Sequence, residues 1–503
     1  MKRKIFLTLV LTVLMLAIFM LASCSDEDVT TTINNSTTSS DITTTVNNIT
    51  TTVPPTETYS TKTDVRRTWE GKTLNIACST YSTQPSAPWS VTELCVDYGK
   101  ESGFGTKIDT AVLERQEFIK ETYGVELNWI IATRYSMHDA LETAVAAGNV
   151  HYDLAMPRAM RAQSIVSGGY VYDLKDREFI NFNNSYYNKN SVEAYTAKGH
   201  TFFVDGDFSI LSEETAFVLY FNKDMLGGDE ATVNLYKKVR EGKWTWNELV
   251  TLANVYSNDG DGINTDMDTY GFYTASPSRF YEYFGVNQAG VDSATGEWMI
   301  TLNDPKVDDI ISAIITVSTA DWCRAAWGGS YGCTANPFSD NRFLFYNETV
   351  SLVDQTKMNK NVGVVPFPML NDEQGRYSVP CAMSHITLMC IPKITQDRAM
   401  SEYFLDVLAW TGNEYTTKAY LEQKADQFES DADMEMLTEY IFPNITYDVG
   451  AAIGWESLIG DIIFNSFKNN VNNFDTEYAG GEPDALLIIE DWNAAWGGYT
   501  EEY

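Results

Sequence analysis

A stretch of oxygen-bearing side chains between residues 257 and 268 has the residue types and spacing of a calcium loop. Its sequence, SNDGDGINTDMD, places oxygen ligands at the first, third, fifth and twelfth positions and Gly262 at the sixth. The four oxygen ligands are Ser257, Asp259, Asp261 and Asp268. Ser257 stands where Asp is usual, and Asp268 replaces a bidentate Glu. Two interpretations therefore stay open, a structural Ca²⁺ site and a solvated turn rich in Asp, Asn and Gly. No other cofactor is expected.

The cysteines and histidines offer no zinc or redox motif. Apart from Cys24, which belongs to the N-terminal segment, the cysteines are Cys78, Cys95, Cys323, Cys333, Cys381 and Cys390. An even number outside the membrane permits disulfides, such as one between Cys323 and Cys333, but buried free thiols are the alternative. No CxxC pair and no His/Cys cluster occurs, which argues against a zinc site.

The elements that must position a binding site begin near Gly71. Apolar periodicity predicts alternating strands and helices at residues 74–78, 108–123, 125–131, 137–145 and 152–156. Gly124 follows the first helix, where a C-terminal cap belongs. The resulting βαβαβ order predicts a parallel, doubly wound sheet, whose ligands lie beyond the carboxyl ends of the strands.

That rule selects residues in two loops. Arg158 and Arg161 follow the third strand, and Tyr81 and Trp89 lie in the long loop after the first. These four residues are candidate ligand-binding residues because of their position and not because of their type. Either arginine could equally be a solvated charge at a helix start.

Trp322 and Trp327 lie in an aromatic loop at 321–331, DWCRAAWGGSY. For each ring taken singly, core packing is the favoured interpretation. A Trp beside Gly-Gly in a loop is harder to bury than one on a helix face, so both are kept as candidate ligand-binding residues.

Beyond residue 222 the helical pattern restarts. Thr245 and Glu248 have the spacing of a capping box at the start of a helix. Further helices are predicted at 304–319, 399–410 and 414–421, and the last one at 483–496.

The first 24 residues have the order of a secretory signal, with a basic start, an apolar run and LASC at 21–24. That ending resembles the bacterial lipoprotein box, which implies that Cys24 is acylated and becomes a lipid anchor. An uncleaved transmembrane helix is the alternative. The following residues, 25–67, form a Ser/Thr-rich tether instead of a basic flank, and with few large apolar groups they are expected to be disordered.

Length and charge bound the remaining possibilities. A chain of 503 residues exceeds what one core holds and predicts at least two lobes. Its 69 acidic and 35 basic residues give a net charge of -34, which disfavours nucleic acid or an anionic membrane surface as a partner. No second long apolar run follows residue 24, so we expect the protein to be anchored to a membrane without crossing it.

Short segments spread along the chain carry a family resemblance. They are YDL at 152–154, GYVYDL at 169–174, YFNK at 220–223, WTWNEL at 244–249, VGVVPFP at 362–368 and SEYFLDVL at 401–408. In this order and spacing, the chain from about residue 70 to its end resembles the extracellular solute-binding proteins of ABC importers. That family includes the maltose- and oligosaccharide-binding proteins.

The resemblance implies an α/β, two-lobed periplasmic-binding-protein-like fold, in which each lobe is a doubly wound sheet flanked by helices and hinge strands join the lobes. After the signal at 1–24 and the tether at 25–67, lobe 1 would comprise 68–218 and 366–428, and lobe 2 would comprise 219–365 and 429–503. The resemblance also assigns Tyr281 to an aromatic wall and Trp455 to a sugar-stacking position, where the local match is loose.

The expected function is capture of a carbohydrate, most simply an oligosaccharide, between the lobes by hinge closure, and its delivery to an ABC permease. The protein would act as a lipid-anchored monomer on the extracellular face of the bacterial cytoplasmic membrane, without catalysing a reaction. Sugars present an apolar C–H face and a hydroxyl edge, which aromatic rings and polar side chains match. The alternatives are a peptide or other small solute, a non-transport glycan sensor or adhesin, and a lipid-anchored glycosidase, for which no catalytic motif is present.

Overall fold

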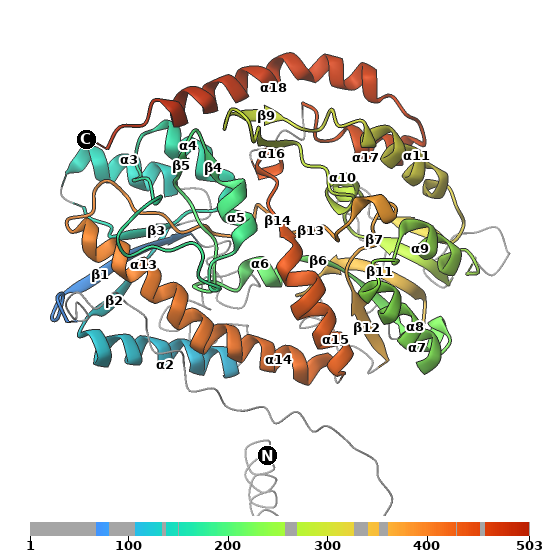
Figure 1. The fold of residues 1–503 in the computed structure, drawn as a ribbon, viewed down its shortest axis with the longest axis horizontal. Helices are drawn as coiled ribbons and strands as arrows, with labels where there is room; N and C mark the ends of the chain where they lie inside the picture. Colours follow the sequence, from blue (N-terminus) through green and yellow to red (C-terminus); the bar gives the residue numbers. More distant parts are fainter. Residues whose placement is uncertain are drawn as a thin grey trace, which may run out of the picture. The chain divides into compact units, whose positions relative to one another are not determined.

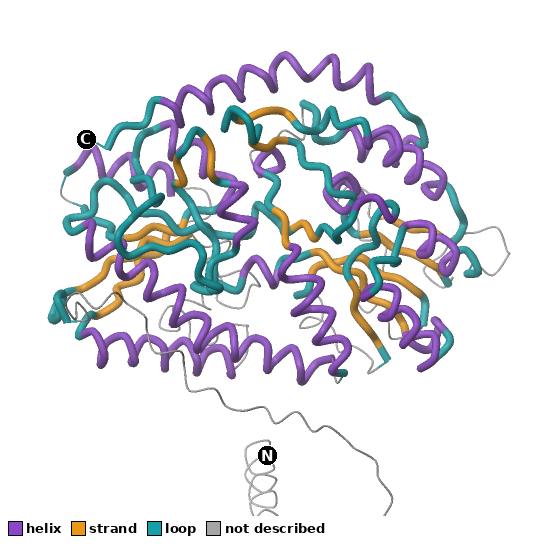
Figure 2. The backbone as a smooth tube through the Cα atoms, in the orientation of Figure 1, coloured by secondary structure: helices purple, strands orange, loops and turns teal. Residues whose placement is uncertain are grey.

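The computed structural model describes residues 67–79, 106–132, 137–148, 150–256, 269–325, 341–351, 361–428, 430–452 and 458–501. These residues belong to one compact unit, 64–503, which contains two larger sheets and three two-stranded ones, with helices around them (Figures 1 and 2). The proposed anchor at Cys24, the tether and the calcium loop at 257–268 lie outside the described residues. Within the described part of the chain, no helix is both long enough and apolar enough to cross a membrane.

The first sheet is three-stranded and parallel, in the order β2-β1-β3. Its elements are β1 (Thr73–Ser79), α2 (Thr106–Tyr123), β2 (Glu126–Ala132), α3 (Met137–Ala147) and β3 (Leu154–Met156). In the register of the sheet, Ile76 lies between Trp129 and Leu154. Gly124 ends α2 with φ of 70°, and its N–H donates to Lys120 O at 2.9 Å. The predicted βαβαβ order and parallel sheet are confirmed.

Shorter elements follow β3 along the chain. They are η3 (Ala159–Arg161), α4 (Ala162–Ser167), α5 (Lys189–Ala194), β4 (Thr196–Ala197), β5 (His200–Thr201) and α6 (Leu211–Glu214). Two later helices also pack on this side, α13 (Arg398–Gly412) and α14 (Lys418–Phe428), joined by the π-helical turn η6 (Asn413–Thr417). Tyr403 and Phe404 of α13 contact Tyr123 of α2 edge to face, so the α13 face toward α2 is aromatic.

The second sheet has five strands in the order β10-β7-β11-β6-β12. Its strands are β6 (Phe217–Asn222), β7 (Tyr270–Thr274), β10 (Cys323–Ala325), β11 (Phe343–Thr349) and β12 (Val362–Val365). β7, β10 and β11 are parallel, whereas β6 runs antiparallel to both β11 and β12. Every residue of β6 is buried, as expected for a central strand covered on both faces.

Helices of the second sheet are α7 (Lys223–Leu226), α8 (Asp229–Arg240), α9 (Trp246–Ala253), α10 (Phe280–Tyr283) and α11 (Lys306–Ser318). The helix start predicted at Thr245 is correct, but the side-chain hydrogen bonds of the predicted capping box do not form. Thr245 is the N-cap residue, but its side chain accepts no capping hydrogen bond, and Glu248 pairs with Lys238. The first-turn N–H of Trp246 donates to Met369 O at 2.7 Å, so a neighbouring backbone satisfies the donor.

The remaining elements connect the two sheets. They are β8 (Ala289–Val291), β9 (Trp298–Ile300), β13 (Val379–Pro380), α15 (Asp431–Glu435), η7 (Met436–Ile441), β14 (Ile445–Thr446), α16 (Val449–Ala452), α17 (Ile462–Asn469) and α18 (Phe474–Gly497). α18 begins well before the predicted residue 483. Pro483 lies inside the helix and does not start it, because preceding turns continue it despite the lost N–H. We call β1–β3, α2–α5, β4, β5, α13 and the segments 157–210 and 386–397, which bridge to one another, the first half. The second half comprises β6, β7 and β10–β12 with α7–α11 and the segments 275–279 and 458–469.

The four described cysteines, Cys78, Cys323, Cys381 and Cys390, are buried thiols, and no two of them form a disulfide with each other. The interpretation of buried thiols is confirmed for these four. Cys95 and Cys333 lie outside the described residues.

Candidate functional site

The carboxyl ends of the parallel strands place polar residues at one edge of each sheet. In the first sheet, β3 leads into Pro157, Arg158 and η3. In the second, β7 leads into η4 (Pro277–Arg279). Because β6 is antiparallel to β11, the start of β6 lies beside the end of β11, and the segment before β6 therefore reaches the same edge. There, Ser351 N–H donates to Glu214 O at 3.0 Å. This edge is where ligands bind in open α/β sheets.

A charged cluster lies beside this edge, among segments that are far apart in the sequence. We call it the junction cluster, and its members are Asp205, Asp207, Glu213, Arg279, Glu282, Cys381, Tyr447 and Asp448. The Cys381 thiol is buried and interacts electrostatically with Asp205, Arg279, Glu282 and Glu213, which places these groups around it. Arg279 also lies 4.8 Å over the ring of Phe217, at the start of β6. The cluster thus joins α6, α10 and the start of α16.

Two aspartates of the cluster are held by specific donors. Asp205 accepts hydrogen bonds from Tyr447 Oη at 2.5 Å and from Gly206 N–H at 2.8 Å. Asp207 accepts from Asn413 Nδ2 at 2.7 Å and from Thr417 Oγ1 at 3.1 Å, both on η6. Burial raises the pKa of each aspartate to about 6 despite these donors.

Glu213 is the partly exposed carboxyl group of α6 at the junction. Ser212 Oγ donates to its Oε2 at 2.9 Å. Burial, followed by the charges of Asp205 and Asp207, raises the pKa of Glu213 to about 8. The raised pKa extends the pH range in which the side chain is protonated, and the protonated carboxyl group can both donate and accept a hydrogen bond.

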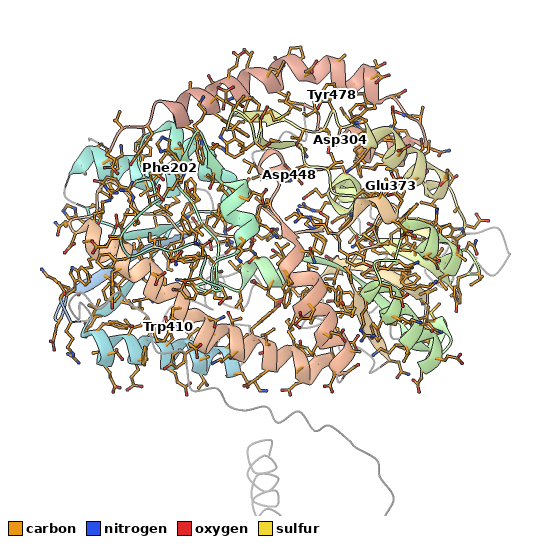
Figure 3. All side chains as sticks on the ribbon, viewed as in Figure 1. Phe202, Asp304, Glu373, Trp410, Asp448 and Tyr478 are labelled. Atoms are coloured by element: carbon orange, nitrogen blue, oxygen red, sulfur yellow. The ribbon has the colours of Figure 1, made fainter. Side chains whose placement is uncertain are left out.

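Glu282 and Asp448 complete the cluster on the side of the second half. Glu282 pairs with Arg279 at 2.7 Å, and burial raises the pKa of Glu282 to about 7. Asp448 is buried and accepts from the backbone N–H groups of Gln288 and Gly450, each at 2.9 Å (Figure 3). Asp448 therefore ties the start of α16 to the segment that enters β8.

The raised pKa values predict that the protein loses stability as pH rises. Because the carboxyl groups of Asp205, Asp207, Glu213 and Glu282 have folded pKa values above their unfolded ones, the folded state holds more protons between roughly pH 4 and 8. Stability is then highest below the unfolded pKa values and declines through the folded ones. We expect the Tm to be about 5 °C lower at about pH 8.5 than at about pH 5.5.

Differential scanning calorimetry of the wild type and of Glu213→Gln checks this prediction. The amide that replaces the Glu213 carboxyl group cannot ionise, so the variant should show a smaller decline than the wild type. A Tm that is constant or rises over this range would contradict the assignment.

Four of the sequence-selected site residues are described, and they have different surroundings. Arg158 is fully buried, and its backbone forms a bridge with Thr387. Arg161 is half-buried at the end of η3. Tyr281 is buried near Asp448, and its hydroxyl accepts a hydrogen bond from Gln288 Nε2 at 2.5 Å.

Trp322 lies at the other edge of the second sheet. It is half-buried, and it directly precedes β10. Its carbonyl accepts from the N–H groups of Gly271 and Phe272, at the start of β7. Since β7 and β10 are parallel, Trp322 lies near the amino ends of these strands. η4 follows the carboxyl end of β7, at the opposite end of the strands. The other selected residues, Tyr81, Trp89, Trp327 and Trp455, lie outside the described residues.

The carboxylates of the junction cluster were not predicted as site residues. Asp205, Asp207 and Glu213 lie in the stretch VDGDFSILSEE, shortly before β6. A usable signal was the density of acids directly before a mostly apolar segment. Arg279 and Asp448 carried no such signal, because their partners come from distant segments.

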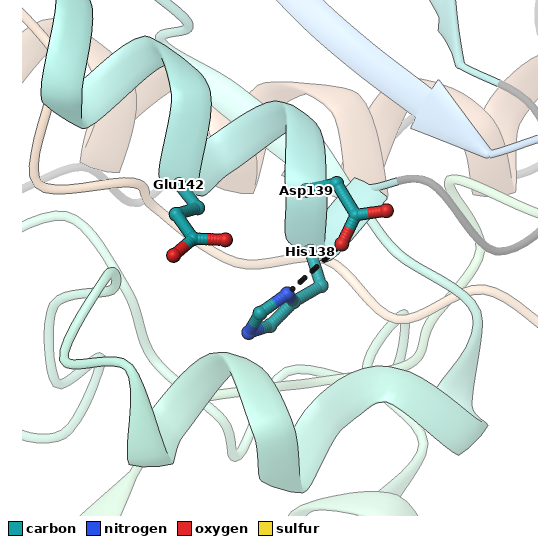
Figure 4. Close-up of side chains that lie close together, drawn as sticks. All are labelled: His138, Asp139 and Glu142. Carbon is teal, nitrogen blue, oxygen red and sulfur yellow. Dashed lines mark hydrogen bonds and ion pairs between the residues drawn. The ribbon is translucent and has the colours of Figure 1, made fainter.

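One group of three potential metal ligands occurs among the described residues, at the start of α3 (Figure 4). His138, Asp139 and Glu142 have ligand atoms within 4.8 Å of one another, and His138 Nδ1 lies 3.3 Å from Asp139 Oδ1. Asp139 and Glu142 are exposed, and a carboxylate in a first turn is favoured by the helix dipole. The dipole accounts for the acid in the first turn without an ion.

Comparison with known proteins defines the class. The profile of the bacterial extracellular solute-binding proteins matches residues 115–425, and the chain belongs to this family. A comparison with curated protein sequences returned no match.

Solved structures share the fold at low sequence identity. The galacto-N-biose-/lacto-N-biose I-binding protein of an ABC transporter from Bifidobacterium longum is 10% identical, with a TM-score of 0.54 over 84% of this chain and 98% of that one. The sugar-binding protein MalE from Xanthomonas citri is 10% identical, with a TM-score of 0.52 over 86% and 100%. The cyclic alpha-maltosyl-1,6-maltose binding protein from Arthrobacter globiformis is 11% identical, with a TM-score of 0.51 over 84% and 99%. The two-lobed α/β fold expected from the sequence is confirmed.

Proposed function

We propose that this protein captures an oligosaccharide between its two halves and delivers it to an ABC permease. Membership of the solute-binding family carries this proposal, with the junction cluster as its chemical support. Three structural neighbours are named as binding proteins for sugars, and they share the fold of this chain. Capture would proceed by closure of the halves, since a ligand that contacts both of them stabilises the closed population.

The chemistry of the junction cluster suits a hydroxylated ligand. Protonated Glu213 offers a donor and an acceptor, and Arg279 offers donors elsewhere in the same cluster. A site that pairs hydroxyl groups in this way rejects analogues that lack them, because its own buried polar groups would be left unpaired. The cluster also contains several acids, which favours a neutral sugar over an anionic solute.

A thermal-shift screen of residues 25–503 tests the ligand class. Samples would contain mono- and oligosaccharides, short peptides or Ca²⁺, because a ligand of the native state raises the midpoint by mass action. We expect a dose-dependent rise with one glycan family and no product. A rise with peptides alone would show that the ligand is a peptide and not a sugar. Consumption of a glycan during the assay would show that the protein is a glycosidase and not a binding protein.

The contribution of the cluster can be measured with the glycan that the screen identifies. We expect Glu213→Ala to weaken binding by roughly tenfold or more in titration calorimetry, because a hydrogen bond to a hydroxyl is lost in a low-dielectric site. Glu142→Ala is the matched control, since it removes an exposed acid on α3 and should leave the affinity unchanged. Equal affinities for the two variants would remove Glu213 from the binding site.

The remaining parts of the proposal concern the membrane. We propose that Cys24 is lipidated, that the tether at 25–67 gives the binding domain reach, and that the protein is a monomer outside the cell. Labelling of intact cells with a fatty-acid analogue tests the anchor, with Cys24→Ser as the control. An equally labelled variant would exclude Cys24 as the lipidated residue.

A further inference from the structure

Helix α18 connects the two halves outside the strands and loops that join the sheets. At its start it packs against α17, which in turn packs against α11 and η4 of the second half. At its other end it packs against α4 of the first half. Figure 1 shows α18 as a long red helix that arches from the side of α11 and α17 to the side of α3 and α4. A helix of this length is a stiff rod of roughly 35 Å.

The C-terminal part of α18 forms hydrogen bonds with two neighbouring elements, β9 and α4. Asn493 Nδ2 donates to Trp298 O at 3.0 Å and its Oδ1 accepts from Trp298 N–H at 2.8 Å, on β9. Trp496 is fully buried, and its Nε1 donates to Gln163 Oε1 of α4 at 2.8 Å. The hairpin of β8 and β9 reaches the first half as well, since Lys198 N–H donates to Gly296 O at 2.7 Å.

Residues 499–501 then fasten the end of the helix to the first half. Tyr499 Oη accepts from Asp173 N–H at 3.1 Å, and Lys393 Nζ donates to Thr500 O at 2.9 Å. Lys393 also lies 5.1 Å over the ring of Tyr499. Glu501 pairs with Arg177 at 2.6 Å and with Arg398 at 3.2 Å. We call residues 499–501 the latch.

The latch combines exposed ion pairs with one aromatic contact, since the ring of Tyr499 packs edge to face against Phe202 and His200. The Glu501 side chain is 54% exposed, and ion pairs at such positions contribute about 1 kcal/mol or less. A cavity of about 260 Å³ lies beside the latch, lined by Val166, Val171, Phe202, Lys393, Ala494 and Tyr499 among others. The latch therefore borders a solvent-accessible pocket next to α4.

The part of α18 nearer its start contains Pro483 and two glycines. Pro483 removes one backbone donor inside the helix, and such prolines kink helices. Gly481 contacts the second half closely, because an added Cβ would lie 2.3 Å from Leu458 O. A helix that is held by contacts with both halves limits movement between its attachment points.

We infer that α18 is a strap that restricts the relative movement of the two halves, and that the latch fastens it. This inference rests on the proposed capture of ligand by closure. A strap narrows the ensemble of the ligand-free protein, so less conformational entropy is lost when ligand binds. Release of the latch should broaden the ensemble and weaken binding.

Single-molecule energy transfer in the full chain tests the strap without any ligand. Azide-bearing residues at positions Glu142 of α3 and Val233 of α8, which are both exposed, would carry the dyes and avoid the native cysteines. We expect Tyr499→Ala to broaden the distribution of transfer efficiency. The matched control is Leu487→Ala, which changes a residue of α18 that is 59% exposed. A distribution for Tyr499→Ala as narrow as that of the control would overturn the inference.

Two further measurements separate this test from folding and from the proposed function. Tyr499→Ala could lower the Tm of the whole chain, so Glu501→Gln serves as a second variant. It removes only the surface ion pairs, and it should still broaden the distribution of transfer efficiency. With the glycan identified by the screen, we expect Tyr499→Ala to bind roughly threefold to tenfold more weakly. Failure of every glycan to shift the wild-type distribution would contradict capture by closure. Equal distribution widths and equal affinities for Tyr499→Ala and Leu487→Ala would contradict the strap but not the proposed function.

Discussion

Replacement of Asp433 by alanine is expected to destabilise the protein by about 4 kcal/mol. Asp433 is buried on α15, and three donors from separate elements converge on its carboxylate. Lys223 Nζ donates at 2.8 Å, Tyr236 Oη at 2.5 Å and Val364 N–H at 2.9 Å. Alanine would leave all three donors without this acceptor, one of them a cation, and would also open a cavity.

Glu435 of the same helix provides the matched control. It pairs with Arg240 at 2.5 Å, but both side chains are more than one third exposed, so Glu435→Ala should cost about 1 kcal/mol or less. Urea denaturation followed by circular dichroism measures both variants. Similar midpoints for the two variants would show that Asp433 is not the structural centre that its contacts indicate.

Replacement of Lys424 by methionine is expected to cost about 3 to 5 kcal/mol. Lys424 on α14 pairs with Glu214 on α6 at 3.0 Å, and the two side chains are 0% and 2% exposed. Methionine fills a similar volume, yet it leaves the Glu214 carboxylate buried without its cation. Breaking one side of a buried pair is costly because the remaining charge loses its compensation.

Two additional variants distinguish this charge effect from lost packing. The double variant Glu214→Gln with Lys424→Met removes both charges and should recover most of the lost stability. Lys418→Met breaks the neighbouring pair with Glu414, in which Lys418 is 59% exposed, and should cost about 0.5 kcal/mol or less. A double variant as unstable as the single one would assign the loss to packing.

Much of the architecture could be predicted because its signals are local. The apolar spacing of α2 and β2, and Gly124 between them, follow from backbone geometry and burial that each segment expresses by itself. The order of strands and helices then restricted the topology to a parallel sheet, which the register of β1 with β2 and β3 confirms. The predictions that were wrong concern helix starts, where Met369 O replaced a side-chain cap at α9 and Pro483 was absorbed into α18.

The sequence by itself determined the class of the fold, the family resemblance and the edge of the sheets at which a ligand is expected. Only the tertiary structure decided that Asp205, Glu213, Arg279 and Asp448 gather into one cluster, and that Tyr281 and Arg158 are buried. The reason is that charge environments and burial depend on contacts between segments hundreds of residues apart, such as Tyr447 with Asp205. Local propensity carries no information on such contacts, whereas the folded chain sets them through packing.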